Sequence, residues 1–222
     1  MNKQESAADL VLEDVRILRA GQPLIHIAAR VEPGSVLTVM GESGIGKSTL
    51  LSYLAGFLPP DFSGSGRVLL GGTDITALPA HARRMGLLFQ DDLLFAHMSV
   101  IENLMFAVPH DVSRAERRRR AEAALCDVAL ENMETRDPAT LSGGQRARVA
   151  LMRVLLSEPR ALLLDEPFSR LDMALRDQIR ALVFAKARER HLATLLVTHD
   201  VRDAEAAKGP VITLQGRQDT AK

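Results

Sequence analysis

The feature that most constrains this chain is an apolar run, then a glycine-rich loop, then a stretch that favours a helix. Residues 36–40 are apolar and β-prone, and residues 47–57 are compatible with a helix. The loop between them reads Gly41-Glu42-Ser43-Gly44-Ile45-Gly46-Lys47-Ser48-Thr49. A strand, a glycine loop and a helix in this order are the arrangement of a phosphate-binding loop.

The residue types in this glycine loop (residues 41–49) suit phosphate chemistry. Glycines let the backbone wrap closely around phosphates, and successive N–H groups with the helix N-terminus supply a fixed positive field. Lys47 adds a point charge for the β- and γ-phosphates, and the Ser48 hydroxyl can ligate Mg²⁺. Glu42 is unfavourable beside phosphates, so we expect its side chain to face solvent.

The rest of the chain alternates short β-type runs with helical stretches, which predicts an α/β fold with a mainly parallel sheet. The β-type runs are 11–18, 24–31, 36–40, 67–70, 85–89, 161–164, 193–197 and 211–214, and the longer helical stretches are 47–57, 113–130, 145–156 and 172–190. Strand signals disappear over residues 91–140, which we interpret as an inserted helical subdomain. We expect one domain over 1–222, with its core at about 1–90 and 141–222.

The apolar run 161–164 ends in two acids, Asp165 and Glu166. Adjacent residues of a strand point to different sides, so one carboxylate can serve a Mg²⁺ shell while the other faces the attacking water. We assign Asp165 to the metal and Glu166 to the water, as general base. Alone, such a run is as often a strand-end turn, and the glycine loop upstream favours the catalytic interpretation.

Residues 141–145 read Leu-Ser-Gly-Gly-Gln and precede a helical stretch, so they would form a second anion site at a helix N-terminus. Here the sequence resembles the ATP-binding subunits of ABC transporters, whose LSGGQ motif it matches without change. The resemblance implies an ATPase that uses ATP and Mg²⁺, on a P-loop NTPase fold with a RecA-like core, an antiparallel β edge and a helical subdomain. It also implies a two-fold, head-to-tail dimer, in which one copy covers the glycine loop of the other with Ser142, Gly143, Gly144 and Gln145.

Three further residues match the family in its order along the chain. Gln90 resembles the Q-loop glutamine, which touches Mg²⁺ and the water. Asp172 resembles the D-loop aspartate, which crosses the dimer interface, and His199 resembles the switch histidine, which bonds the γ-phosphate. Each is weak alone. Together they imply a catalytic set of Lys47, Gln90, Glu166 and His199, and a metal set of Ser48, Gln90 and Asp165.

The sequence also departs from the family in two places. Family members usually stack an aromatic residue on adenine near the first strand, where this chain has Leu18 and Arg19. We expect adenine to be held loosely, or by the planar guanidinium of Arg19. Arg170 stands where many relatives have a small residue, so we expect it to alter the dimer seam.

The segment 94–104, Leu-Phe-Ala-His-Met-Ser-Val-Ile-Glu-Asn-Leu, is similar to a segment of bacterial importer ATPases that receives the permease. We expect Phe95, Met98 and Val100 to contribute apolar surface to that groove, and Ser99 with Glu102 to cap a helix. The resemblance implies permease subunits and a solute-binding protein as partners, at the cytoplasmic face of the cell membrane. No apolar run reaches the roughly 18 residues of a membrane span, and residues 1–12 lack the pattern of a secretory signal.

Composition restricts the remaining interpretations. Lys plus Arg and Asp plus Glu number 28 each, so no global field favours nucleic acid. Arg114 and the run 117–120 are basic. We interpret them as a solvated helix face in preference to a surface that contacts a partner or lipid headgroups. The single Cys126 is expected to be a small buried hydrophobe.

Other classes of ATPase fit the sequence less well. The alternative to a transporter subunit is a soluble ABC-type ATPase acting on DNA or ribosomes. The interval between Lys47 and Ser142 leaves no space for the long coiled coil of the chromosome-maintenance type, and ribosome-associated types usually carry two cassettes. A P-loop kinase would not need the LSGGQ motif. Because few residues follow the last predicted strand, we expect this chain to lack the regulatory domain of larger importer ATPases.

Overall fold

The structure, a computed structural model, describes residues 7–214. It divides the chain into two compact units. The sheet unit contains the residues up to Met85, then Arg160–Glu166, and those from Phe184 onward. The helical unit contains Gly86–Pro159 and Pro167–Val183. The predicted α/β class is therefore confirmed, whereas the predicted limits of one domain and its subdomain stay a prediction.

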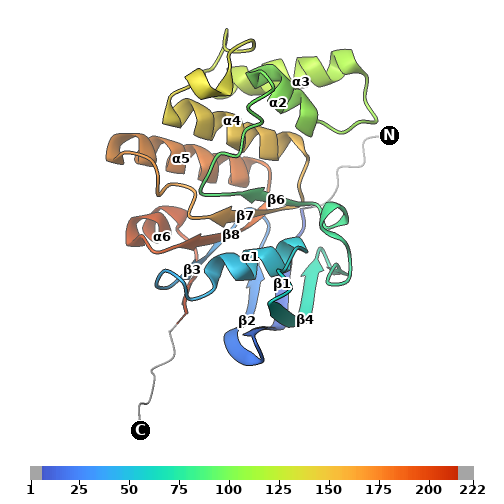
Figure 1. The fold of residues 1–222 in the computed structure, drawn as a ribbon, viewed down its shortest axis with the longest axis vertical. Coiled ribbons are helices and arrows are strands. Elements are labelled where there is room, and N and C mark those ends of the chain that lie inside the picture. The colour runs from blue at the N-terminus through green and yellow to red at the C-terminus, as the bar shows by residue number, and fades with distance from the viewer. Residues whose placement is uncertain (1–6, 215–222) are drawn as a thin grey trace. The chain divides into compact units, whose positions relative to one another are not determined.

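The core of the sheet unit is a parallel sheet in the order β7-β8-β3-β9 (Figure 1). These strands are β7 (Ala161–Asp165), β8 (Ala193–Thr198), β3 (Val36–Met40) and β9 (Val211–Thr213). Every residue of β8 is buried, and so are four residues in each of β3 and β7. Nearly continuous apolar runs are typical of strands covered on both faces. Helix α1 (Lys47–Ala55) contacts β7, and α6 (Val201–Ala207) contacts β3 and β8.

The sheet unit also contains an antiparallel sheet in the order β2-β1-β4-β5. These strands are β2 (Gln22–Val31), β1 (Leu10–Arg19), β4 (Phe62–Leu70) and β5 (Thr73–Asp74). A bulge in β1 gives Asp14 a positive φ of 49° and shifts the register between Leu12 and Val15. The facing Gly66 must be glycine, because a Cβ there would lie 2.4 Å from the Asp14 carbonyl oxygen. This sheet is the predicted antiparallel edge.

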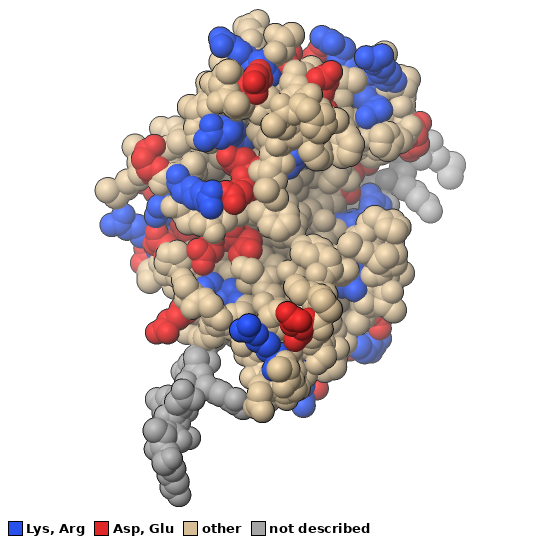
Figure 2. Space-filling view, viewed as in Figure 1, with Lys and Arg blue, Asp and Glu red and all other residues tan. Residues whose placement is uncertain are grey.

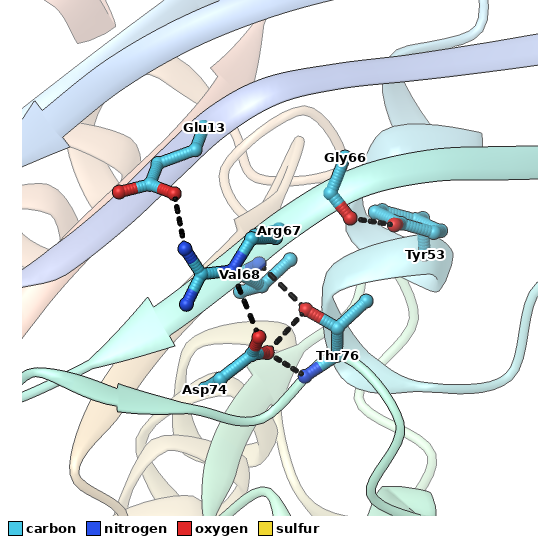
Figure 3. Close-up of polar contacts among 7 residues, drawn as sticks. All are labelled: Glu13, Tyr53, Gly66, Arg67, Val68, Asp74 and Thr76. Carbon is cyan, nitrogen blue, oxygen red and sulfur yellow. Dashed lines mark hydrogen bonds and ion pairs between the residues drawn. The ribbon is translucent and has the colours of Figure 1, made fainter.

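A polar network joins three strands of the antiparallel sheet (Figure 3). The Arg67 guanidinium lies 3.1 Å from the Glu13 carboxylate and 3.0 Å from that of Asp74. Hydrogen bonds from the Thr76 hydroxyl and backbone N–H, and then from Arg67, lower the pKa of Asp74 to about 2. The network therefore keeps Asp74 ionised well below neutral pH.

The helical unit packs α2 (Val100–Ala107), α3 (Arg114–Cys126) and α4 (Gly143–Leu156) against one another (Figure 1). The predicted cap of α2 is confirmed, because Ser99 and Glu102 form a capping box. The predicted surface role of Val100 is wrong, since its side chain is fully buried at the start of α2.

Four further elements complete the described part of the chain. Turns of 3-10 helix occur at Ala80–Ala82 and Pro138–Thr140. Strand β6 (Met85–Leu88) has its first residue in the sheet unit and the others in the helical unit. Helix α5 (Met173–Glu189) begins in the helical unit and ends in the sheet unit. Within residues 91–140 the structure has no strand, as predicted.

The surface of the helical unit corrects one prediction and supports another. Cys126 is exposed rather than buried, because the packed side of α3 is formed by Ala121, Ala124 and Leu125. The arginines at 118–120 form ion pairs with glutamates, as a solvated basic face would. Figure 2 shows Lys and Arg side chains interspersed with Asp and Glu side chains.

Candidate functional site

The glycine loop connects the end of β3 to the first turn of α1, as its sequence predicts. Gly44 and Gly46 have positive φ values of 85° and 102°. Gly46 is the N-cap of α1, and no side chain caps that end of the helix. The first N–H groups of α1 therefore keep their capacity to bind an anion. Glu42 is exposed, as expected, so its charge is directed to solvent.

Lys47 places a buried ammonium group over this loop. The residue is only 5% exposed. Its Nζ donates hydrogen bonds to the carbonyl oxygens of Gly41 at 2.8 Å and Glu42 at 2.9 Å. It also lies 3.5 Å from Glu166 Oε1. A fixed positive charge at a helix N-terminus is the electrostatic environment that a polyphosphate needs.

Ser48 and Asp165 form a second contact at the same end of the sheet. Ser48 Oγ donates to Asp165 Oδ1 at 2.9 Å. Burial, the largest influence, raises the pKa of the Asp165 carboxyl above its usual value of 3.8, although the Ser48 hydrogen bond opposes that effect. A nearby cation would restore the ionised carboxylate.

The oxygen pair of Ser48 and Asp165 also fits Mg²⁺ geometrically. Adjacent ligands of an octahedral Mg²⁺, with metal–oxygen distances of about 2.0–2.1 Å, stand about 2.9 Å apart. Among residues 7–214, no cluster of three or more His, Cys, Asp or Glu side chains could hold a metal ion. A metal bound here would therefore take its other ligands from groups outside such a cluster, such as phosphate, water or an amide oxygen.

Glu166 connects these groups to a histidine. The residue follows β7 in the left-handed conformation, with φ of 43°, and its N–H donates to the Val197 carbonyl at 2.9 Å. Its carboxylate is 18% exposed and contacts Lys47 through Oε1 and His199 Nδ1, at 3.1 Å, through Oε2. Non-glycine residues with positive φ are uncommon and often occur at functional sites. The two adjacent acids, Asp165 and Glu166, thus contact different partners, as predicted.

Five predicted residues are therefore brought together within the sheet unit: Lys47, Ser48, Asp165, Glu166 and His199. Glu166 and His199 directly follow the carboxyl ends of the parallel strands β7 and β8, where open α/β sheets bind their ligands. The backbone strain at Glu166 gives no sequence signal. The other predicted residues, Gln90, Asp172 and the LSGGQ segment (residues 141–145), belong to the helical unit.

In the helical unit, the LSGGQ segment starts helix α4. Ser142 is the N-cap, and it forms a capping box with Gln145. Gly143 is open, since the nearest atom to an added Cβ would be 4.0 Å away, whereas a Cβ on Gly144 would lie 2.5 Å from the Leu175 side chain. Packing within the chain thus explains the glycine at 144 but not the one at 143.

Gln90 and its neighbours line a hollow of about 400 Å³ in the helical unit, together with Gly143 and Arg146. Arg170 pairs with Asp91, the residue after Gln90. Asp172 uses its carboxylate to accept the Leu175 N–H at 3.0 Å, so it caps the start of α5. The ion pair between Arg170 and Asp91 therefore joins the segment that follows Gln90 to the segment that precedes Asp172.

At the predicted adenine position the structure reveals an aromatic neighbour of Arg19, while the expectation for adenine itself stays a prediction. No aromatic residue is close to Arg19 in sequence, but the antiparallel register places Phe62 opposite it. The Arg19 guanidinium lies 5.8 Å from the centre of the Phe62 ring. Arg19 therefore already has an aromatic partner from β4, a contact that only the strand pairing reveals.

Sequence comparisons agree with this geometry. The profile of the ABC transporter family matches residues 24–169. An uncharacterized ABC transporter ATP-binding protein of Escherichia coli, YnjD, is 49% identical over 183 residues, which is 82% of this chain and 84% of that protein. The thiamine import ATP-binding protein ThiQ of Jannaschia sp. is 43% identical over 92% of this chain and 88% of its own length. The Fe(3+) ions import ATP-binding protein FbpC of Agrobacterium fabrum is 40% identical over 93% of this chain, but only 58% of its own length.

Within residues 7–214, no helix has both the length and the apolar character needed to cross a membrane. The match of the family profile covers the glycine loop, the LSGGQ segment and the acids at the end of β7. The chain therefore belongs to the ABC transporter family, as an ATP-binding and ATP-hydrolysing subunit that energises transport.

Proposed function

We propose that this chain energises the import of a solute through permease subunits, by hydrolysing Mg-ATP between two copies of itself at the cytoplasmic face of the membrane. The observation that carries the proposal is the grouping of Lys47, Ser48, Asp165, Glu166 and His199 at one end of the parallel sheet. The import direction is supported by relatives named for thiamine and Fe(3+) import. A solute-binding protein is the further partner that such a system uses.

In this proposal each residue has a defined task. The backbone N–H groups of the glycine loop and Lys47 bind and orient the phosphates. Ser48, Asp165 and Gln90 would hold Mg²⁺, which would neutralise phosphate charge. Glu166 accepts a proton from the attacking water, and His199 hydrogen-bonds the γ-phosphate and fixes Glu166.

The second copy supplies the opposite wall of the site. Ser142, Gly143, Gly144 and Gln145 present a helix N-terminus to the γ-phosphate, and Asp172 lies at the seam between copies. The open face of Gly143 is compatible with such a close approach. Since only the closed dimer completes both sites, ATP favours closure, and closure would move the surfaces that contact the permease.

The experiment compares the wild-type protein with Glu166→Gln. The variant should bind Mg-ATP and form a stable dimer by size-exclusion chromatography with light scattering, while its hydrolysis falls about 10²–10⁴-fold. A monomer under these conditions, or turnover at the wild-type rate, would contradict the proposal.

The direction and the substrate are tested in membrane vesicles that contain the permease and the solute-binding protein. Thiamine and Fe(3+) are the first solutes to assay, because the two named relatives import them. ATP-dependent accumulation is expected with the wild-type subunit and not with Glu166→Gln. Export of a preloaded solute would overturn the assignment as an importer and leave the ATPase assignment intact.

A further inference from the structure

A buried polar pair lies at the junction between β8 and α6, beside His199. Thr198, the last residue of β8, is 1% exposed, and Asp203, in the first turn of α6, is 3% exposed. Thr198 Oγ1 donates a hydrogen bond to Asp203 Oδ2 at 2.7 Å. Burying a carboxylate is unfavourable unless hydrogen bonds compensate for its lost hydration. The pair is not among the residues to which the proposed mechanism assigns a task.

The Thr198 hydroxyl also fixes the backbone on the far side of His199. It accepts a hydrogen bond from the Asp200 N–H at 3.0 Å, so the peptide that joins His199 to Asp200 is bonded to the residue before His199. The Asp203 N–H donates to the Asp200 carbonyl at 3.1 Å, and the Asp200 carboxylate caps α6 by accepting the Arg202 N–H. His199 is the exposed residue of a turn that is bonded on both sides.

Little packing holds the His199 ring itself. Its side chain is 53% exposed, and its Nδ1 lies 3.1 Å from Glu166 Oε2. A half-exposed ring depends on its backbone for direction, and a displacement of about 1 Å in a reacting group can reduce turnover by about 10²-fold. The precision of the contact between His199 and Glu166 is therefore set by the turn.

We infer that Thr198 and Asp203 are positioning residues that aim His199 at Glu166 through the turn between β8 and α6. The inference rests on the proposed role of His199 in hydrolysis. Thr198 contributes through one hydroxyl that makes two hydrogen bonds, so replacing it gives a sharper test than replacing Asp203.

The test uses two variants that differ in one group. Thr198→Val keeps the shape and removes both hydrogen bonds, whereas Thr198→Ser keeps both. We expect Thr198→Val to lower kcat for ATP hydrolysis about 10-fold with less than about a twofold change in KM, and Thr198→Ser to stay within about twofold of the wild type. Asp203→Asn, which retains an acceptor oxygen for the Thr198 hydroxyl, should have an intermediate effect. Thermal unfolding of each variant serves as the control that it is folded.

The decisive comparison repeats Thr198→Val in a His199→Ala background, with single-turnover rates at saturating enzyme. The additional loss should vanish there, since no ring remains to be aimed. An equal loss in both backgrounds would overturn the inference, as would equal turnover by the Val and Ser variants. Full turnover by His199→Ala would also overturn it, while the ATPase assignment is tested separately through Glu166→Gln.

Discussion

Two helix N-termini in this molecule are constructed in opposite ways. Helix α1 has Gly46, with a φ of 102°, as its N-cap and has no side-chain cap, and the buried Lys47 adds charge to this end. Helix α4 has Ser142 as its N-cap, and this residue forms a capping box with Gln145. The first end keeps its N–H groups for a ligand, whereas the second satisfies part of its own.

The difference suggests how two anion sites can share one nucleotide. An uncapped end with a buried lysine is strong enough to bind phosphate within one copy. A self-capped end is stable without a ligand, so in the proposed dimer it could associate and dissociate reversibly. In our proposal, ATP therefore binds to the glycine loop first, and the LSGGQ segment of the second copy joins it.

The largest expected effect comes from removing the charge at α1. Lys47→Ala should lower ATP hydrolysis by about 10²–10³-fold or more, because it removes the fixed cation that faces the phosphates. Transport in vesicles should be abolished. Colorimetric phosphate release measures the rate, and circular dichroism shows whether the variant is folded. Normal transport by Lys47→Ala would contradict the claim that the uncapped end of α1 binds phosphate through this lysine.

The paired glycines of α4 separate packing from function. Gly144→Ala should destabilise the protein by about 1–3 kcal/mol, because the new methyl group overlaps the Leu175 side chain. Gly143→Ala should leave the free energy of unfolding nearly unchanged, because its surroundings are open. We expect it instead to lower hydrolysis about 10-fold by obstructing the second copy. Urea unfolding and ATPase assays of both variants decide the matter, and equal stabilities would contradict the assignment.

Ser142 tests the self-capping of α4. Ser142→Ala should reduce the free energy of unfolding by about 1 kcal/mol. Ser142→Thr keeps a capping hydroxyl and should lose only a few tenths of that. In the Glu166→Gln background, the Ala variant should also dimerise less with Mg-ATP. Unchanged stability of Ser142→Ala would mean that the capping box contributes nothing and that the two helix ends do not differ as described.

The smallest effect on stability, with the opposite sign, is expected at Asp165. Burial raises the pKa of this carboxyl, so between its ordinary value of 3.8 and the raised value the folded state binds more protons than the unfolded state. This contribution therefore lowers stability as the pH rises through that interval. Asp165→Asn should raise the Tm of the nucleotide-free protein at pH 7 while abolishing Mg²⁺-dependent hydrolysis. Calorimetry at pH 7 and pH 3.5 should show the gain in Tm disappear at the lower pH.

Much of the fold could be predicted because its strands are nearly continuous apolar runs. The predicted run 36–40 coincides with β3, and the predicted stretch 145–156 lies within α4. The sequence did not reveal β5, which has two residues, or α6, which has seven. Such short elements carry too few residues for a periodic pattern, and long-range contacts decide them.

The site was predictable where a motif carries its chemistry, and not where backbone geometry does. Lys47, Ser48, Asp165, Glu166 and His199 come together as their motifs suggested. The contact of Phe62 with Arg19 depends on strand register, and the burial of Val100 depends on helix packing. The pairing of Thr198 with Asp203 had no signal, because a threonine and an aspartate five residues apart are common in any sequence.

The left-handed backbone at Glu166 has a consequence for how this chain tolerates mutation. Its φ of 43° suits glycine and asparagine better than glutamate. Glu166→Gly and Glu166→Asn should therefore unfold at higher temperature than the wild type while they lose the general base. A library of variants selected for solubility alone will accumulate well-folded but inactive variants at this position. Only selection for ATP turnover will remove them.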